Sequence, residues 1–233
     1  MSPDQPLPYA LPPSPPQKRG KGKLLAAGVG VLTLLGTVGG GYFYFGDGSA
    51  RDRYELATPG TLLGEYKRIP GSADGPTDAS DRKDNEDIGI VDSHNAGSDY
   101  TAGSGFNPKK LFFHGVWGKI SDPERTLDKM FSKLADEPAK NAGNSSMNIE
   151  GTARKVTPKG LDGGAVMKCQ YFKLSNGQME LRMPYCLWVD HSTAGAVGTV
   201  DPSAVRGGSA PSLDAAAETA ARVRQEVRVK TEK

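Results

Sequence analysis

Residues 165–189, AVMKCQYFKLSNGQMELRMPYCLWV, contain the pattern that decides the fold of this chain. Two runs rich in strand-forming residues, 165–174 and 179–189, flank the polar segment 175–178, which reads SNGQ. A short segment with Asn-Gly between two such runs is typical of a β-hairpin. The stretch therefore predicts two antiparallel strands joined by a tight turn.

The turn of this hairpin has two alternative placements, which give different strand registers. If residues 176–177 form the two-residue loop, Cys169 lies opposite Pro184. If residues 177–178 form the loop, in a type II′ turn with glycine first, Cys169 lies opposite Cys186. Only the second register brings the two cysteines of the chain together.

The second register suits both the cysteines and the proline. It places Cys169 and Cys186 at a non-hydrogen-bonded pair, where Cα atoms lie about 4.5 Å apart, within disulfide range. Pro184 then faces Tyr171 at a pair of the same kind, so its missing N–H costs no bond to that strand. We therefore predict a Cys169–Cys186 disulfide, which the chain-entropy model values at about 3 kcal/mol.

Around the hairpin, the sequence predicts further strands and two helices. Strand-forming residues are concentrated at 111–120, more weakly at 147–156, and again at 196–200. Apolar residues at helical spacing follow capping sequences that begin at Ser121 and Ser212. The predicted fold class is α+β: an antiparallel sheet of about four or five strands packed with two or three helices. One transmembrane helix and disordered segments are expected to precede it.

The expected transmembrane helix is residues 24–45, LLAAGVGVLTLLGTVGGGYFYF, which contain no charged residue. Its 22 residues would span about 33 Å as a helix, and a bilayer hydrocarbon core is about 30 Å thick. A cleaved signal peptide would have a shorter apolar core and small residues before its cleavage site. Bulky rings occupy residues 42–45 instead, so we expect an uncleaved signal-anchor.

Flanking charges predict the orientation of this helix. The topogenic cations Lys18, Arg19, Lys21 and Lys23 precede it, which favours a cytoplasmic N-terminus and an extracytoplasmic C-terminal domain. A disulfide is chemically permitted on that outer side. Gly36 and Gly40 have the GxxxG spacing of close helix–helix contacts. Because glycine is common in membrane helices, homo-association through these two residues is only a weak hypothesis.

The expected location is therefore the cell membrane, with a single crossing and five parts in the chain. Seven prolines within residues 1–17 indicate an extended, solvated N-terminus. The parts are a disordered, proline-rich, basic cytosolic tail (1–23), the transmembrane helix (24–45), a juxtamembrane segment with a short helix (46–68), a flexible acidic linker rich in Gly, Ser and Asp (69–108), and the main body of the exported domain (109–233).

Charge and motifs exclude several function classes. The formal net charge is only +2, which gives no electrostatic footprint for nucleic acid. Asp190, His191 and Ser192 are the residue types of a catalytic triad, but adjacent residues on a turn cannot form the required line of nucleophile, base and orienting acid. His94 and His114 lie in no catalytic or metal-binding pattern. We expect no cofactor, no metal site and no enzymatic activity.

Four segments carry a resemblance to a known group: ATPGTLLGEYKR (57–68), GLDGGAVMKCQ (160–170), CLWVDHSTAGAV (186–197) and SLDAAAETAARVRQEVRV (212–229). With the proline-rich tail, the basic cluster and the single anchor, they make the chain resemble single-pass, membrane-anchored envelope proteins of actinobacteria. No activity is established for that group, so the resemblance carries over no site residue.

The expected function is that of a membrane-anchored extracytoplasmic protein. It would contact the lipid bilayer and use its exported domain to bind an envelope ligand or protein partner without catalysis. The alternative is a signalling or assembly protein whose proline-rich cytosolic tail recruits a partner.

Overall fold

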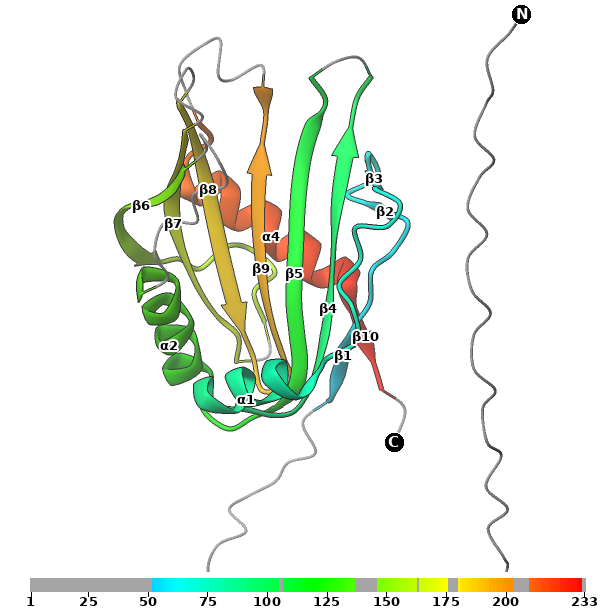
Figure 1. The fold of residues 1–233 in the computed structure, drawn as a ribbon, viewed down its shortest axis with the longest axis vertical. Helices are drawn as coiled ribbons and strands as arrows, with labels where there is room; N and C mark the ends of the chain where they lie inside the picture. The colour runs from blue at the N-terminus through cyan, green and yellow to red at the C-terminus, as the bar shows by residue number, and fades with distance from the viewer. Residues whose placement is uncertain are drawn as a thin grey trace, which may run out of the picture. The chain divides into compact units, whose positions relative to one another are not determined.

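A computed structural model describes the chain in six stretches (Figure 1): residues 52–104, 107–136, 146–162, 164–175, 180–202 and 210–231. They form an α+β fold around an eight-stranded antiparallel sheet with the strand order β2-β3-β4-β5-β9-β8-β7-β6. The strands of this sheet are β2 (Thr61–Leu62), β3 (Tyr66–Arg68), β4 (Ile90–Ala102), β5 (Lys109–Ile120), β6 (Ser146–Lys155), β7 (Val166–Ser175), β8 (Glu180–Val189) and β9 (Thr193–Val200).

Two short strands and three helices complete the described part. Strand β1 (Tyr54–Leu56) pairs with β10 (Arg228–Lys230) in a separate two-stranded sheet. The helices are α1 (Ala79–Ile88), α2 (Pro123–Asp136) and α4 (Leu213–Val227). Most neighbouring strands of the sheet follow one another in the sequence. The exception is the pair β5 and β9, which are joined across a long stretch of chain.

The two faces of the large sheet are covered by different helices, as Figure 1 shows. Strand β8 illustrates the alternation of its side chains: Cys186 and Trp188 belong to the core under α4, while Leu187 and Val189 belong to the core under α1 and α2. Successive side chains of a strand point to opposite faces, so one strand contributes to both cores. The α+β class is confirmed.

The sheet is larger than the four or five strands that we expected, first because residues 52–68, the described part of the expected juxtamembrane segment, contain no helix. They form β2 and β3, joined by a tight turn in which Leu63 and Gly64 have φ values of 54° and 74°. The Glu65 N–H donates to the Leu62 carbonyl at 3.2 Å, which closes the turn. Positive φ at two consecutive residues is typical of hairpin turns and incompatible with a right-handed helix.

The second correction concerns residues 69–108, which we expected to be a flexible linker. They contain α1 and β4, the latter 13 residues long. Helix α1 begins with a capping box between Asp78 and Asp81 and ends at Gly89, whose φ is 101°. The buried residues of β4 include Ser98, whose hydroxyl pairs with that of Ser72 at 2.8 Å. Between the fully buried Ile90 and Tyr100, small or polar side chains occupy the buried positions, so the composition of this part of the strand does not indicate burial.

The hairpin and its register are confirmed. Cys169 pairs with Cys186 across β7 and β8, and the two residues form a disulfide with a Cα–Cα distance of 4.1 Å. Tyr171 pairs with Pro184 in the same register. The turn itself, at 176–179, lies outside the described residues. The observed pairing of the described residues is the register in which the two cysteines face each other.

The predicted membrane anchor also lies outside the described residues. This applies to residues 24–45 with Gly36 and Gly40, and to the topogenic cations in the tail 1–23. In the stretches that the structure describes, no helix is long and apolar enough to cross a membrane. The anchor and its orientation therefore stay predictions from the sequence.

Candidate functional site

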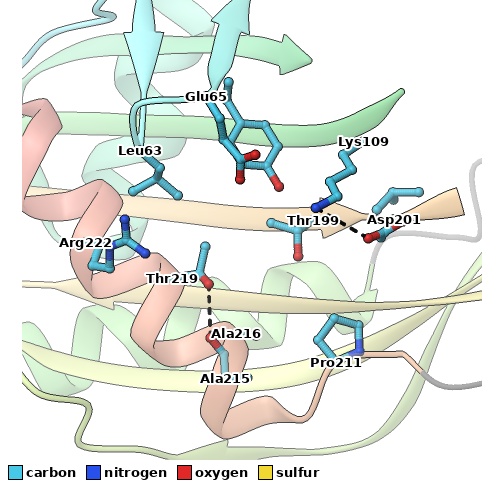
Figure 2. A pocket seen from close by; sticks show the side chains of 12 residues that line it. Leu63, Glu65, Lys109, Thr199, Asp201, Pro211, Ala215, Ala216, Thr219 and Arg222 are labelled. Atoms are coloured by element: carbon cyan, nitrogen blue, oxygen red, sulfur yellow. Dashed lines mark hydrogen bonds and ion pairs between the residues drawn. The ribbon is translucent and has the colours of Figure 1, made fainter. Parts of the chain in front are cut away.

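A pocket of about 210 Å³ lies on the α4 side of the large sheet (Figure 2). Its walls come from the first half of α4, the β2–β3 turn, the start of β5 and the end of β9. The lining residues are Leu63, Glu65, Tyr66, Lys109, Thr199, Val200, Asp201, Pro211, Ala215, Ala216, Thr219 and Arg222.

The sheet register explains why such distant residues meet at the pocket. Extending the observed pairing by one residue places Tyr66, Ala102, Lys109 and Asp201 in one row across β3, β4, β5 and the residue after β9. Side chains in one row on one face of a sheet are direct neighbours. Thr199 lies two residues before Asp201, so its side chain is on the same face of the sheet. These strands therefore build one side of the pocket.

Helix α4 supplies the opposite wall. Ala215, Thr219 and Arg222 are four and three residues apart, which places them on one helical face. The helix starts here because Ser212 caps it: the Ser212 hydroxyl accepts the Ala215 N–H at 3.2 Å. The Thr219 hydroxyl donates to the Ala215 carbonyl at 3.1 Å.

The β2–β3 turn forms the rim and is held against α4. The Leu63 N–H donates to Glu226 Oε2 at 2.8 Å, joining the turn to the helix. A left-handed conformation costs a residue with a side chain about 1–2 kcal/mol. Leu63 keeps it because Leu62, next to it, is fully buried in the core and Glu226 holds the N–H. Backbone strain of this kind is concentrated at ligand-binding sites.

Four charged side chains line the pocket, two of each sign. Lys109 Nζ lies 3.8 Å from Asp201 Oδ2. Glu65 and Arg222 form no ion pair with another residue in the described stretches. Burial, and then the charges of Glu65 and Asp201, raise the pKa of the Tyr66 hydroxyl. Tyr66 is therefore a neutral hydroxyl at neutral pH, able to donate and to accept a hydrogen bond.

A second polar cluster lies deep between α4 and the β8–β9 turn. Arg224 is fully buried, and its Nη2 donates to Asp190 Oδ2 at 2.9 Å while its Nη1 donates to Asp162 Oδ1 at 2.7 Å. Asp190 Oδ1 also accepts the N–H groups of Ser192 and Thr193 at 2.9 and 2.8 Å. This ion cluster joins the helix to the turn, and none of its residues lines the pocket described above, so we assign it a structural role.

The pKa of Asp190 reflects this environment. Burial acts to raise the pKa, but hydrogen bonds from Thr193 and Ser192 and the charges of Arg228 and Arg224 outweigh burial and lower it. Asp190 is therefore an anion across the physiological pH range. A buried anion with so many donors stabilises the fold rather than acting as a proton acceptor.

His114 and His94 do not line the pocket, and the partners described for them are not nucleophiles. His114 Nδ1 lies 3.0 Å from Asp74 Oδ1, and its Nε2 lies 3.4 Å from Asp99 Oδ1. The hydrogen bond to Asp74 raises the pKa of His114, with the charges of both carboxylates adding to it against partial burial. His94 stacks on Trp117 with ring centroids 4.2 Å apart. Both contacts favour structural roles.

The triad residue types at the β8–β9 turn are arranged as a polar turn. Asp190 bonds directly to Ser192, while His191 Nδ1 donates to the Ile120 carbonyl at 3.1 Å. His191 therefore does not lie between the acid and the hydroxyl, as a relay requires. In the described stretches, no group of three or more His, Cys, Asp or Glu side chains could hold a metal ion.

The pocket is the feature that the sequence did not reveal. Its residues come from 63–66, 109, 199–201 and 211–222, which no local pattern connects. The disulfide that the sequence did reveal lies in the core under α4. Gly64 at the β2–β3 turn was the available signal, because glycine adopts positive φ in hairpin turns without steric cost.

Comparison of the chain with protein-family models, with curated proteins and with solved structures found no match. The resemblance to actinobacterial envelope proteins thus stays a prediction, and the site has to be interpreted from its own geometry.

Proposed function

We propose that this chain is a membrane-tethered extracytoplasmic protein whose folded domain binds a ligand or partner without catalysing a reaction. The pocket between α4, the β2–β3 turn and the ends of β5 and β9 carries the proposal. Four separate elements build it, and the side chains that line it carry charges of both signs. The predicted anchor at 24–45 supplies the tether, and the disulfide is consistent with an oxidising compartment.

The chemistry of the lining favours binding over catalysis. No histidine or cysteine is among the described residues that line the pocket. The Thr219 hydroxyl is occupied by a backbone carbonyl, and burial keeps the Tyr66 hydroxyl protonated. A nucleophile needs a base hydrogen-bonded to it or a lowered pKa; in the described stretches neither hydroxyl is hydrogen-bonded to a basic side chain, and the pKa of Tyr66 is raised. Hydroxyls and charges without such activation serve to orient a bound molecule.

Filling the pocket tests this proposal. Ala215→Trp places a large side chain in the pocket wall from an exposed position on α4, so the fold should tolerate it. Glu218→Trp adds the same side chain to an exposed position of the same helix outside the lining. We expect the full chain and the Glu218→Trp variant to capture the same component from cell-envelope fractions, and Ala215→Trp to lose it. Equal capture by both variants would contradict the proposal.

Two deletions test the tether and the cytosolic tail. Deleting residues 24–45 should release the protein from the membrane fraction, whereas the full chain should resist extraction at alkaline pH. Deleting residues 2–17 should leave capture unchanged if the pocket is the binding site. Loss of capture with the tail alone would instead support the alternative in which the proline-rich segment recruits a cytosolic partner.

A further inference from the structure

The pocket has an acidic side. Glu65 on the β2–β3 turn and Asp201 after β9 both act electrostatically on the Tyr66 hydroxyl. Asp201 forms an ion pair with Lys109, whose Nζ lies 3.8 Å from its Oδ2. Glu65 has no cationic partner among the described residues. One free carboxylate beside a neutral hydroxyl is complementary to an ammonium group, which carries three donors and no acceptor.

The helix side of the pocket has the opposite character. Figure 2 shows Arg222 on α4 and Glu65 on the turn, which are two different walls. The Arg222 side chain is exposed and has no anionic partner in the described stretches. A guanidinium binds a carboxylate through two parallel hydrogen bonds, with a geometry that a planar anion matches. This wall is therefore complementary to a carboxylate.

The space between the charges is small, and its lining contains both polar and apolar surface. The volume is about 210 Å³. It lies below the range of about 300–1,000 Å³ that is typical for drug-sized ligands. Leu63, Val200, Pro211 and Ala216 supply apolar surface to the lining. The occupant is thus a small molecule with charged ends and a short apolar part.

We propose that the pocket binds a small zwitterion with an ammonium group and a carboxylate on one short skeleton, that is, an α-amino acid or a dipeptide. This assignment rests on the proposed binding function and names its ligand class. The ammonium group faces Glu65 and the Tyr66 hydroxyl, the carboxylate faces Arg222, and the side chain contacts Leu63 and Pro211. An exposed ion pair contributes little by itself, so both ends must be engaged for measurable affinity.

Matched ligands separate the two ends. We would titrate leucine into the full chain in detergent and measure heat and thermal stabilisation. The comparison ligands are 4-methylpentanoate, which lacks the ammonium group, 3-methylbutylamine, which lacks the carboxylate, and glucose, which lacks both charges. We expect saturable binding of leucine or of alanyl-alanine, with each single-charge ligand at least about tenfold weaker.

Matched variants locate the site. Glu65→Gln and Arg222→Gln should each weaken leucine binding by about tenfold or more, because each removes one end of the dipolar arrangement. Glu218→Gln on α4 and Arg82→Gln on α1 remove exposed charges outside the pocket and should leave binding unchanged. The melting temperature of each variant without ligand shows whether its fold is intact.

The outcomes distinguish this inference from the proposed function. Absence of saturable binding by leucine and alanyl-alanine, or binding that Glu65→Gln and Arg222→Gln do not weaken, overturns the zwitterion assignment. If glucose binds and Ala215→Trp abolishes that binding, the assignment is wrong while the pocket keeps its binding role. Equal capture from envelope fractions by Ala215→Trp and Glu218→Trp overturns the proposed function itself.

Discussion

At the scale of single residues, Asp190 supports the buried end of α4. Asp190→Ala leaves the fully buried Arg224 guanidinium without this carboxylate. Removing one partner of a buried ion pair costs about 3–5 kcal/mol, because the remaining charge stays desolvated. We expect a loss of that size in the free energy of unfolding, measured with urea.

Asp162 provides the control for this substitution. It contacts the same guanidinium, but its own side chain is 74% exposed, so water screens it. Asp162→Ala should cost at most about 1 kcal/mol. Similar losses for the two variants would show that burial of the Asp190 carboxylate does not determine its contribution.

Tyr100 provides the opposite case. Its side chain is fully buried, and its hydroxyl has no hydrogen-bond partner in the described part of the chain. Tyr100→Phe removes a desolvated polar group without breaking a hydrogen bond, so stability should stay the same or rise by up to about 1–2 kcal/mol. Tyr171→Phe is the matched control: its hydroxyl donates to the Pro211 carbonyl at 3.0 Å, and its removal should cost about 1 kcal/mol. A clear loss with Tyr100→Phe would indicate a partner for that hydroxyl.

His114 should make stability depend on pH. Asp74 and Asp99 raise its pKa in the folded state above the value of about 6.5 in the unfolded chain. The stabilisation is fully present below the unfolded pKa and is lost as pH rises through the higher folded pKa. Urea midpoints measured from pH 5.5 to 9 should therefore fall more steeply for the unsubstituted chain than for His114→Gln. Parallel curves would contradict this assignment.

The residue scale is also where sequence analysis is weakest. Arg224 lies late in an amphipathic helix, where cations complement the helix dipole, and nothing in its neighbourhood indicates full burial. The Asp190–Ser192 segment has the composition of a polar turn, which it is, but its carboxylate is 3% exposed and binds two arginines. Burial of a charge depends on a partner that arrives from another element, so local composition cannot indicate it.

At the scale of elements, the hairpin of β7 and β8 was predicted in register because two constraints agreed. The cysteine pair and the proline both required the same pairing, and the structure has it. Strand β4 was missed for a physical reason: its large buried side chains, Ile90 and Tyr100, are ten residues apart, and small or polar residues such as Ser93 and Ser98 occupy the buried positions between them. Strands β2 and β3 have only two and three residues. The sequence around them is therefore too short to distinguish a hairpin from the start of a helix.

The disulfide should make a measurable contribution to stability. Replacing Cys169 and Cys186 together by alanine opens a loop with a sequence separation of 17 residues. The chain-entropy model gives a loss of about 3 kcal/mol, mainly through a less restricted unfolded state. Reduction of the unsubstituted chain should lower the free energy of unfolding, measured with urea, by a similar amount. If the double variant and the oxidised chain unfold at the same midpoint, the cross-link adds no net stability.

At the scale of the whole molecule, the order of strands determines where the pocket lies. Strands β5 and β9 pair although about 80 residues separate their centres in the sequence, and this pairing brings Lys109 near Asp201. Sequence patterns indicate hairpins between neighbouring strands, but they do not indicate which strands pair across a long connection. The fold class could therefore be predicted, whereas the pocket could not.

The last strand should matter for the whole described domain. A chain that stops after Val227 loses β10, so β1 loses its partner and Tyr54 loses the Arg228 guanidinium that lies 3.7 Å from its ring centroid. Arg228 also contacts Asp190 at 3.5 Å, so the ion cluster is weakened as well. We expect a lower melting temperature and faster proteolysis near residues 52–57. Arg228→Lys in the full chain should retain β10 and most of the stability. Unchanged proteolysis after truncation would contradict a role for β10.

The pairing of β1 with β10 has one more consequence. Tyr54 lies opposite Lys230, so the described chain enters and leaves the domain at the same point (Figure 1). A short linker from residue 231 back to residue 52 would close the backbone into a ring without rearranging any strand. A ring has fewer unfolded conformations, so cyclisation would stabilise the fold through the unfolded state. The same geometry makes the domain suitable for insertion into a surface loop of another protein, because both junctions would lie side by side.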